Sequence, residues 1–273
     1  MRIRSSVWIV LLVTVGVLSV ALMPAVSPVV AQAGAQAAFR APRTTFGQPN
    51  LMGIWQAMSS AHFDLEPHGA AFGVPAGVGV VVDPPDGKIP YNAAGLAKRA
   101  ANLRNRATED PAGKCYKPGT PHFVYVPFPF QILQTANQVT LISEYIHNVR
   151  IIYLNRSKHY PDGEVDFWNG DSVGRWDGDS LVTDVANFGG QAWLDRAGNH
   201  SSPDLKVVER FTLIDADTIR YEATMTDPKT YTRPWTIRVL LYRHKEPNVR
   251  ILEYECHAYA ENSLKEPVLP TVR

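Results

Sequence analysis

Hydrophobic and polar residues alternate with a period of two over much of this chain, which is the pattern of half-buried β-strands. The alternation is clearest in 205–213, 218–226 and 235–242, where short polar turns separate the segments. Links this short can join only antiparallel neighbours, so the pattern predicts a meander. The expected strands are 50–55, 78–82, 128–135, 139–143, 144–154, 174–176, 181–185, 205–213, 218–226, 235–242 and 250–256.

One segment has helical spacing instead. Asn92 can cap a helix that runs from Ala93 to about Ala107. Its apolar residues recur at intervals of three and four, and its other face is basic. We expect the helix to lie on the outside or the end of the sheet structure, packed by its apolar stripe; a partner-binding helix is the alternative. The stripe is Leu96, Ala97, Ala100, Leu103 and Ala107.

A long meander tends to close on itself, because closure removes its unpaired edges. Gly53-Ile54-Trp55 in the first expected strand resembles the Gly-x-Trp start of lipocalin-like barrels. The predicted fold is therefore all-β, an antiparallel meander closing into a lipocalin-like barrel, with the one N-terminal helix packed outside. An open β-sandwich is the alternative. The barrel is expected to be a single domain over residues 49–273.

The first residues read as a targeting segment. Arg2 and Arg4 precede an apolar run over 7–23, and small residues lead to Gln32. This order is that of a secretory signal peptide, expected over 1–31, with a flexible leader over 32–48. The run is about 17 residues long, near the lower limit for a membrane span, so a retained anchor is the alternative. Cleavage predicts a periplasmic or secreted protein without membrane contact.

Cys115 and Cys256 are the only cysteines. In an exported protein such a pair is expected to form a disulfide. It would close a loop of about 140 residues and stabilise the fold by about 4–5 kcal/mol in the chain-entropy model. Two cysteines cannot make a structural zinc site, and we expect no metal site elsewhere.

Charge excludes one class of partner. The 27 basic residues less Arg2 and Arg4 leave 25, against 26 acidic residues, so the mature chain carries about one negative charge. A nucleic-acid binder would need a basic surface, and we expect no nucleic acid as partner. The chain also lacks a nucleophile elbow, a phosphate loop, a His-Glu-x-x-His motif and a dinucleotide fingerprint. We therefore expect no cofactor.

The loop over 187–201 carries the first candidate site. Asp195 and His200 could form a carboxylate–imidazole pair in which His200 acts as a base. Trp193 could stack on a flat or sugar-like ligand. The alternative is a capping loop that satisfies its own backbone.

Two further clusters could bind a ligand. Trp168 and Asp171 lie just before the 174–185 hairpin and would suit a carbohydrate or aromatic ligand, or pack at the strand end. Tyr145 and His147 should share one face of the extended 144–154 segment. If that face points inward, Tyr145 binds the ligand and His147 is a further catalytic candidate; otherwise they are structural.

Three residues are candidates because of their strand faces. Glu209 lies among apolar residues and must be paired or have a raised pKa, so it is either an acid–base group or the partner of an arginine on a neighbouring strand. Tyr221 lies on the inward face of its strand as a ligand-binding candidate. Arg233 could clamp a carboxylate, but we expect it to pair with Asp227 across its hairpin.

A longer set of motifs runs through residues 168–179, 227–228, 231–235 and 253–256. It resembles a family of exported bacterial β-rich proteins. The resemblance implies export and a shared fold, and it implies no mechanism. Together these features predict a protein that binds a small organic or carbohydrate-like molecule and catalyses cofactor-independent acid–base chemistry, such as hydrolysis, elimination or isomerisation. The alternative is a non-catalytic carrier or sensor of an apolar small molecule.

Overall fold

The structure is a computed structural model that describes residues 39–258. The predicted signal peptide and the first part of the predicted leader lie outside this range. Of the rest of the leader, Ala41 is buried and Arg43 bridges Pro49. Among the described residues, no helix is long and apolar enough to cross a membrane.

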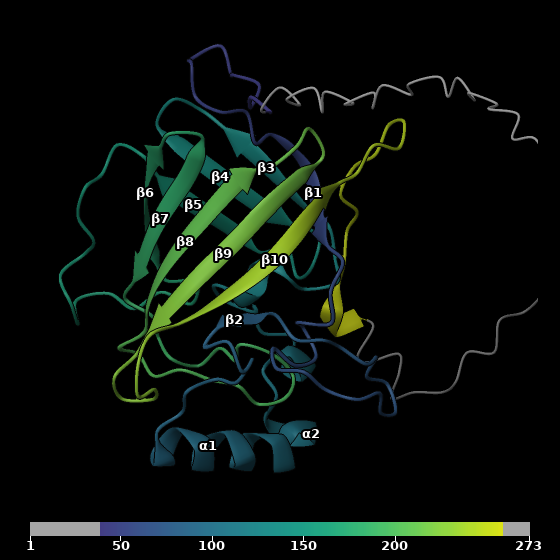
Figure 1. The fold of residues 1–273 in the computed structure, drawn as a ribbon, viewed down its shortest axis with the longest axis vertical. Helices are drawn as coiled ribbons and strands as arrows, with labels where there is room; N and C mark the ends of the chain where they lie inside the picture. Colours follow the sequence, from purple (N-terminus) through teal and green to yellow (C-terminus); the bar gives the residue numbers. More distant parts are fainter. Residues whose placement is uncertain (1–38, 259–273) are drawn as a thin grey trace, which may run out of the picture. The chain divides into compact units, whose positions relative to one another are not determined.

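Nine strands close into a barrel, which confirms the predicted all-β barrel (Figure 1). They follow one another in sequence order, and β1 pairs with β10 to close the ring, with Trp55 opposite Arg243. A tenth, short strand, β2, pairs with β10 alongside the ring. The strands are β1 Gly53–Ala57, β2 Val81–Asp83, β3 Phe130–Gln134, β4 Gln138–Ser143, β5 Val149–Tyr153, β6 Asp171–Asp177, β7 Ser180–Ala186, β8 Lys206–Leu213, β9 Thr218–Thr226 and β10 Trp235–Arg243.

The inward faces are those that the alternation predicts. Every second residue of β8, β9 and β10 is buried, while the residues between them are more exposed. Each large apolar side chain buried in this way contributes about 1.5–3 kcal/mol to folding. The inward residues are Val207, Glu209, Phe211 and Leu213; Ile219, Tyr221, Ala223 and Met225; and Trp235, Ile237, Val239 and Leu241.

One pair of neighbouring strands departs from the predicted meander. β5 and β6 run parallel and share a single paired position, Tyr153 with Val173. Parallel pairing is possible here because the long connection over 154–170 carries the chain back before β6 begins. Gly174 lets the two strands approach closely, because a Cβ at this position would lie 2.6 Å from Ile152. We call this line between β5 and β6 the seam.

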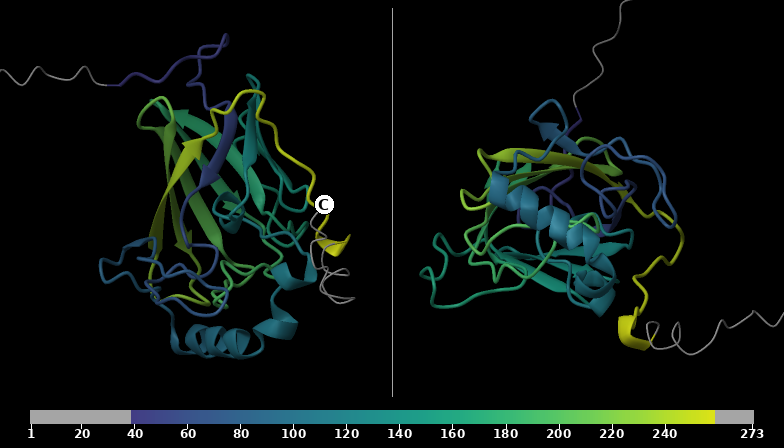
Figure 2. Two further views of the ribbon diagram at one scale, coloured as in Figure 1. Left: turned by 90° about the vertical axis from the view of Figure 1, so that its right-hand side faces the viewer. Right: turned by 90° about the horizontal axis from the view of Figure 1, so that it is seen from below.

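The helical region packs differently from the prediction. It consists of α1 Ala93–Arg104 and the short α2 Arg106–Glu109, and α1 lies across one end of the barrel (Figure 2, right). The apolar stripe does not face the barrel, since Leu96 and Leu103 are 54% and 43% exposed. Gly95 and Asn102 are the buried residues instead. Gly95 permits this packing, because a Cβ there would lie 2.5 Å from the carbonyl oxygen of Thr230.

Residues 244–258, the described chain beyond β10, are held to the barrel without forming a strand, so the predicted strand over 250–256 is wrong. Tyr254 makes one isolated bridge with Tyr145, and a helical turn begins at Cys256. The predicted disulfide is confirmed, since Cys256 is bonded to Cys115 across 141 positions of sequence. Cys115 follows the 3-10 helix Ala112–Lys114, and a second such helix spans His122–Val124. The disulfide therefore ties the C-terminal segment to the loops that precede β3.

Candidate functional site

The centre of the barrel holds a buried charge network. Arg150 of β5 donates to both carboxylate oxygens of Glu209 on β8, at 2.9 Å for Nη1, and to Ser172 on β6. Tyr221 donates to Glu209 at 2.7 Å, and burial together with the Glu209 charge raises the pKa of Tyr221 well above its usual value. The expected arginine partner of Glu209 is confirmed, but it comes from across the barrel and not from a neighbouring strand. Glu209 and Tyr221 are both 0% exposed, so neither meets a ligand from solvent in this conformation.

Asp195 is a structural centre of the 187–201 loop. It is 0% exposed and accepts hydrogen bonds from the backbone N–H groups of Leu65, Ala197 and Asn199 at 2.9–3.1 Å. Burial, and next the charge of Asp64, raise its pKa to about 7. Asp195 thereby organises the polypeptide that covers the α1 end of the barrel.

His200 does not pair with Asp195, so this part of the predicted catalytic arrangement is wrong. Its Nε2 lies 3.0 Å from the carbonyl oxygen of Gly95, and its ring stacks on Tyr91 at 5.7 Å. Burial lowers the pKa of His200. His200 still lines a surface hollow of about 420 Å³, together with Lys98 and the edge of the largely buried Trp193. Glu109 also lines this hollow, but within residues 39–258 no carboxylate is hydrogen-bonded to the His200 imidazole.

A carboxylate–imidazole pair does occur at the seam. Asp171 begins β6, is 4% exposed, and accepts from Nδ1 of His159 at 3.0 Å and from the backbone N–H of Tyr160 at 3.3 Å. Arg156 binds both oxygens of the same carboxylate, at 3.0 and 3.2 Å. The Arg156 guanidinium also lies over the ring of Tyr160, 4.8 Å from its centroid. We call Asp171, His159 and Arg156 the seam triad.

The triad selects one tautomer of the neutral His159 imidazole. A proton on Nδ1 that is donated to Asp171 leaves Nε2 as the basic nitrogen. Among residues 39–258, Nε2 of His159 has no hydrogen-bond partner, and the side chain is 26% exposed. The chemistry available to this group is proton transfer to or from a molecule that approaches from solvent.

Two adjoining hollows provide room for such a molecule. His159 lines one of about 490 Å³, together with Val173, Asp184 and Lys206. A second, of about 550 Å³, shares Asp162, Ala186, Lys206 and Thr226 with the first. The shared residues show that the two hollows adjoin each other, and we call them together the seam groove. Both hollows are within the usual size range of small-molecule sites.

Trp168 lies on the other side of Asp171. Its ring stacks on Tyr116 at 5.2 Å, and its N–H donates to the carbonyl oxygen of Lys117. A hollow of about 280 Å³ is bounded by Trp168, Tyr153 and Asp171. The structure thus brings together two of the predicted ligand-binding residues, Trp168 and Asp171, beside the seam.

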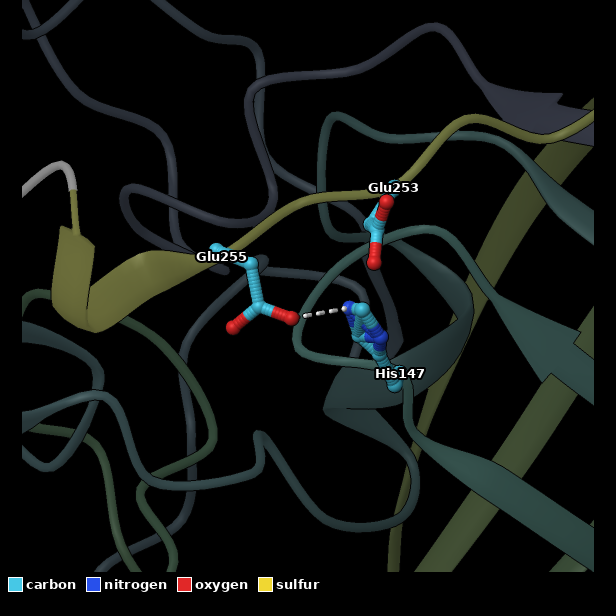
Figure 3. Close-up of side chains that lie close together, drawn as sticks. All are labelled: His147, Glu253 and Glu255. Carbon is cyan, nitrogen blue, oxygen red and sulfur yellow. Dashed lines mark ion pairs between the residues drawn. The ribbon is translucent and has the colours of Figure 1, made fainter.

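Tyr145 and His147 do not share a face, because the predicted 144–154 strand is interrupted by a turn. Ile146 and His147 have φ values of +56° and +47°, so the chain reverses there before β5 begins. Tyr145 is buried against Phe128 and Tyr254. His147 is exposed and points toward Glu253 and Glu255 (Figure 3). The possible ligand atoms of the three side chains all lie within 4.8 Å of one another. These three are the residues of the described chain whose positions suit a metal ion.

Arg233 takes a different partner from the one expected. It binds both carboxylate oxygens of Asp83 in β2, at 2.6 and 3.1 Å. Asp227 instead accepts from the backbone and side chain of Ser202 and from the backbone of Lys229. The expectation of an Arg233–Asp227 pair is wrong, because the β9–β10 turn folds toward the 187–204 region.

A buried histidine pair lies near the same end of the barrel as Asp195. Nδ1 of His62 is 2.9 Å from Nε2 of His122, and Nδ1 of His122 is 2.9 Å from the carbonyl oxygen of Trp193. Burial lowers the pKa of His62 to about 2 and that of His122 to about 4. Both rings are therefore neutral at physiological pH and act as hydrogen-bonding structural groups.

No protein-family model matches this chain, and no curated protein matches it. His159, Arg156, Glu253 and Glu255 are site candidates that the sequence patterns did not single out. His159 and Arg156 lie in the irregular 154–170 connection, where no period marks a face. The two glutamates were assigned to a strand that does not form.

Proposed function

We propose that this protein is an exported enzyme that performs acid–base chemistry on a small organic or carbohydrate-like molecule bound in the seam groove. His159 is the group that transfers the proton, and Asp171 orients it. The observation that carries the proposal is the 3.0 Å contact between a buried carboxylate and an imidazole that lines an open groove. A positioned acid–base group of this kind contributes typically about 10²–10⁴-fold to a rate.

The surroundings of the triad suit a polar substrate. Lys206 and the carboxylates of Asp162 and Asp184 line the groove, and apolar contact comes from Val173 and Val185. Such a wall can bind hydroxyl groups and a ring face at the same time. Hydrolysis, which consumes a water molecule, and elimination and isomerisation can each proceed through a proton transfer, which is the step assigned to His159.

The alternative function, a carrier of an apolar molecule, has less support. A lipocalin-type carrier needs an apolar space inside the barrel. The inward positions here are filled by buried aromatic and aliphatic side chains, with the Arg150–Glu209 pair among them. A ligand of this protein is therefore better accommodated by an outer groove than by the interior.

Export is the second part of the proposal. A disulfide that closes a long loop suits an oxidising compartment, and the N-terminal pattern is that of a signal peptide. We expect a bacterial host that exports the protein to yield a mature chain that begins near Gln32. N-terminal sequencing tests this, and a full-length product retained in the membrane would indicate an anchor instead.

The activity is tested with metabolite mixtures. Extracts of spent bacterial medium are incubated with the mature protein, and mass spectrometry identifies compounds that are consumed. His159→Gln should slow consumption by about 10²–10⁴-fold, and Asp171→Asn should slow it less because the imidazole remains. His244→Gln is the matched control, since His244 also contacts a carboxylate, Glu246, but lies away from the seam groove.

Two outcomes would count against the enzyme. If His159→Gln consumes the compound as fast as the wild type, the triad only supports the 154–170 connection. If a compound is retained by the protein but recovered unchanged, the chain is a carrier or a sensor.

A further inference from the structure

We propose that His147, Glu253 and Glu255 form a binding site for a divalent transition-metal ion, for which Zn²⁺ is the suitable probe, and that the ion fastens segment 252–256 to the β4–β5 turn. The site is separate from the seam triad and does not depend on the proposed function.

The ligand atoms of the three residues converge. Each can offer one atom, and these atoms all lie within 4.8 Å of one another. Nε2 of His147 is 3.1 Å from Oε1 of Glu255. Zinc bonds to nitrogen and oxygen measure roughly 2.0–2.2 Å, so two ligands of one tetrahedral ion lie roughly 3.4 Å apart. The observed separation is close to that value, and Figure 3 shows the three side chains directed toward the same space.

Glu253 and Glu255 lie on an extended segment, and contacts of the residue between them fix which way their side chains point. In extended chain, alternate residues point to opposite sides, so Glu253 and Glu255 face one way and Tyr254 the other. Tyr254 stacks on Tyr145, 5.3 Å between ring centroids, and also contacts Phe128. The aromatic contacts therefore direct both carboxylates toward His147.

The segment is held at both of its ends. The backbone N–H of Leu252 donates to Glu144 at 2.9 Å, and Cys256 is joined to Cys115 by the disulfide. The turn that carries His147 is closed by a hydrogen bond from the backbone N–H of Ser143 to the carbonyl of Asn148, at 2.9 Å. Both parts of the site are thus in place before an ion arrives, which lowers the cost of ordering its ligands.

The charges and ligand types favour a transition-metal ion. Two carboxylates and a neutral imidazole carry a charge of −2, which one divalent ion balances. In residues 39–258, neither glutamate has a lysine or arginine partner. Calcium prefers six to eight oxygen ligands, whereas an imidazole nitrogen with carboxylates suits zinc and its neighbours in the first transition series. All three residues are exposed, so water can complete the coordination shell.

Isothermal titration calorimetry of the untagged mature protein, stripped of metal with a chelator, tests the site with Zn²⁺. We expect one equivalent to bind. His147→Ala, Glu253→Gln and Glu255→Gln should each weaken binding by at least about tenfold, since loss of even an indirect ligand contact costs 10–100-fold. His244→Ala is the control, because His244 is paired with a single carboxylate, Glu246, at 3.2 Å. It should leave the affinity unchanged.

Thermal melting separates metal binding from folding. Zn²⁺ should raise the melting temperature of the wild type and of His244→Ala, and not that of His147→Ala. The three site variants should melt like the metal-free wild type, because their side chains are exposed. The proposal is overturned if Zn²⁺ binding is absent, if it survives all three substitutions, or if Ca²⁺ binds equally well without any dependence on His147.

Discussion

Replacing Glu209 by glutamine should be among the most destabilising single changes of a polar residue in this barrel. Glu209 accepts two hydrogen bonds from Arg150 and one from Tyr221, and the side chains of the ion pair are 0–1% exposed. Glutamine keeps the shape but removes the charge and places an N–H₂ group against one of the Arg150 donors. The guanidinium then remains buried with Ser172 as its other partner.

The size of the effect follows from this burial. Removing one member of a buried ion pair costs about 3–5 kcal/mol, because the other charge stays desolvated. Two unit charges about 4 Å apart interact by about 4 kcal/mol at an effective dielectric constant of 20, which agrees. For a domain of this size, the change corresponds to a fall of about 6–20 °C in melting temperature. It would also be a large part of a total stability of about 5–15 kcal/mol.

Urea unfolding followed by tryptophan fluorescence measures the effect. The matched control is Glu222→Gln, because Glu222 on the adjacent β9 also pairs with an arginine, Arg238, but at the surface. That change should cost about 0–1 kcal/mol. The double variant Arg150→Met/Glu209→Leu removes both charges and should be more stable than Glu209→Gln alone. Equal costs for Glu209→Gln and Glu222→Gln would refute a buried, charged pair in the barrel.

Three further outcomes are expected. Cys115→Ser/Cys256→Ser should lower the free energy of unfolding by about 4–5 kcal/mol, and denaturant titration that finds no loss would contradict the chain-entropy estimate for this loop. Gly95→Ala should lower the melting temperature because its Cβ would lie 2.5 Å from the Thr230 carbonyl, whereas Gly69→Ala, with open space around it, should not; equal melting would show that α1 can shift without cost. The wild type should lose stability as the pH falls from about 6.5 toward 4, because His62 and His122 have lowered pKa values and stay neutral when folded while they gain protons when unfolded. His62→Gln/His122→Gln should reduce that pH slope by up to about 2.7 kcal/mol per pH unit, measured by urea unfolding, and an unchanged slope would mean that the pair is already protonated in the fold.

The barrel could be predicted from the sequence because both the strand pattern and the strand pairing depend on residues close together in the chain. Each strand from β7 to β10 alternates clearly, and its neighbour in space is its neighbour in sequence. Glu209 stood out for the same reason, as a charge on an apolar face. The pairing of β1 with β10 could be predicted because the unpaired edge strands of a long meander tend to pair with each other.

The sites were predicted less well because they join distant segments. His147 and Glu255 meet only because a disulfide and an aromatic cluster carry the C-terminal segment back to the β4–β5 turn. No spacing in the sequence encodes that meeting. Asp195 and His200 are close in sequence, yet Asp195 is occupied by backbone N–H groups from its own loop and from Leu65. Closeness in sequence therefore predicted a pair that does not form. The exposure of Leu96 and Leu103 was not predicted either, because Gly95 allows the opposite face of α1 to approach the Thr230 loop more closely.

The seam gives the barrel wall one line that is held mainly by side chains. Elsewhere, neighbouring strands share ladders of backbone hydrogen bonds, whereas β5 and β6 share one paired position and the contacts of Asn148 with Asn169 and Arg150 with Ser172. Amide protons along Val149–Tyr153 and the start of β6 that face this line should therefore exchange with deuterium sooner than those of β8 and β9. A barrel built in this way can open along the seam while its other neighbouring strand pairs, which are all antiparallel, stay intact. The hydrogen bond from Arg150 to Ser172 crosses that line, so solvent that enters there would gain access to the buried Arg150–Glu209 pair.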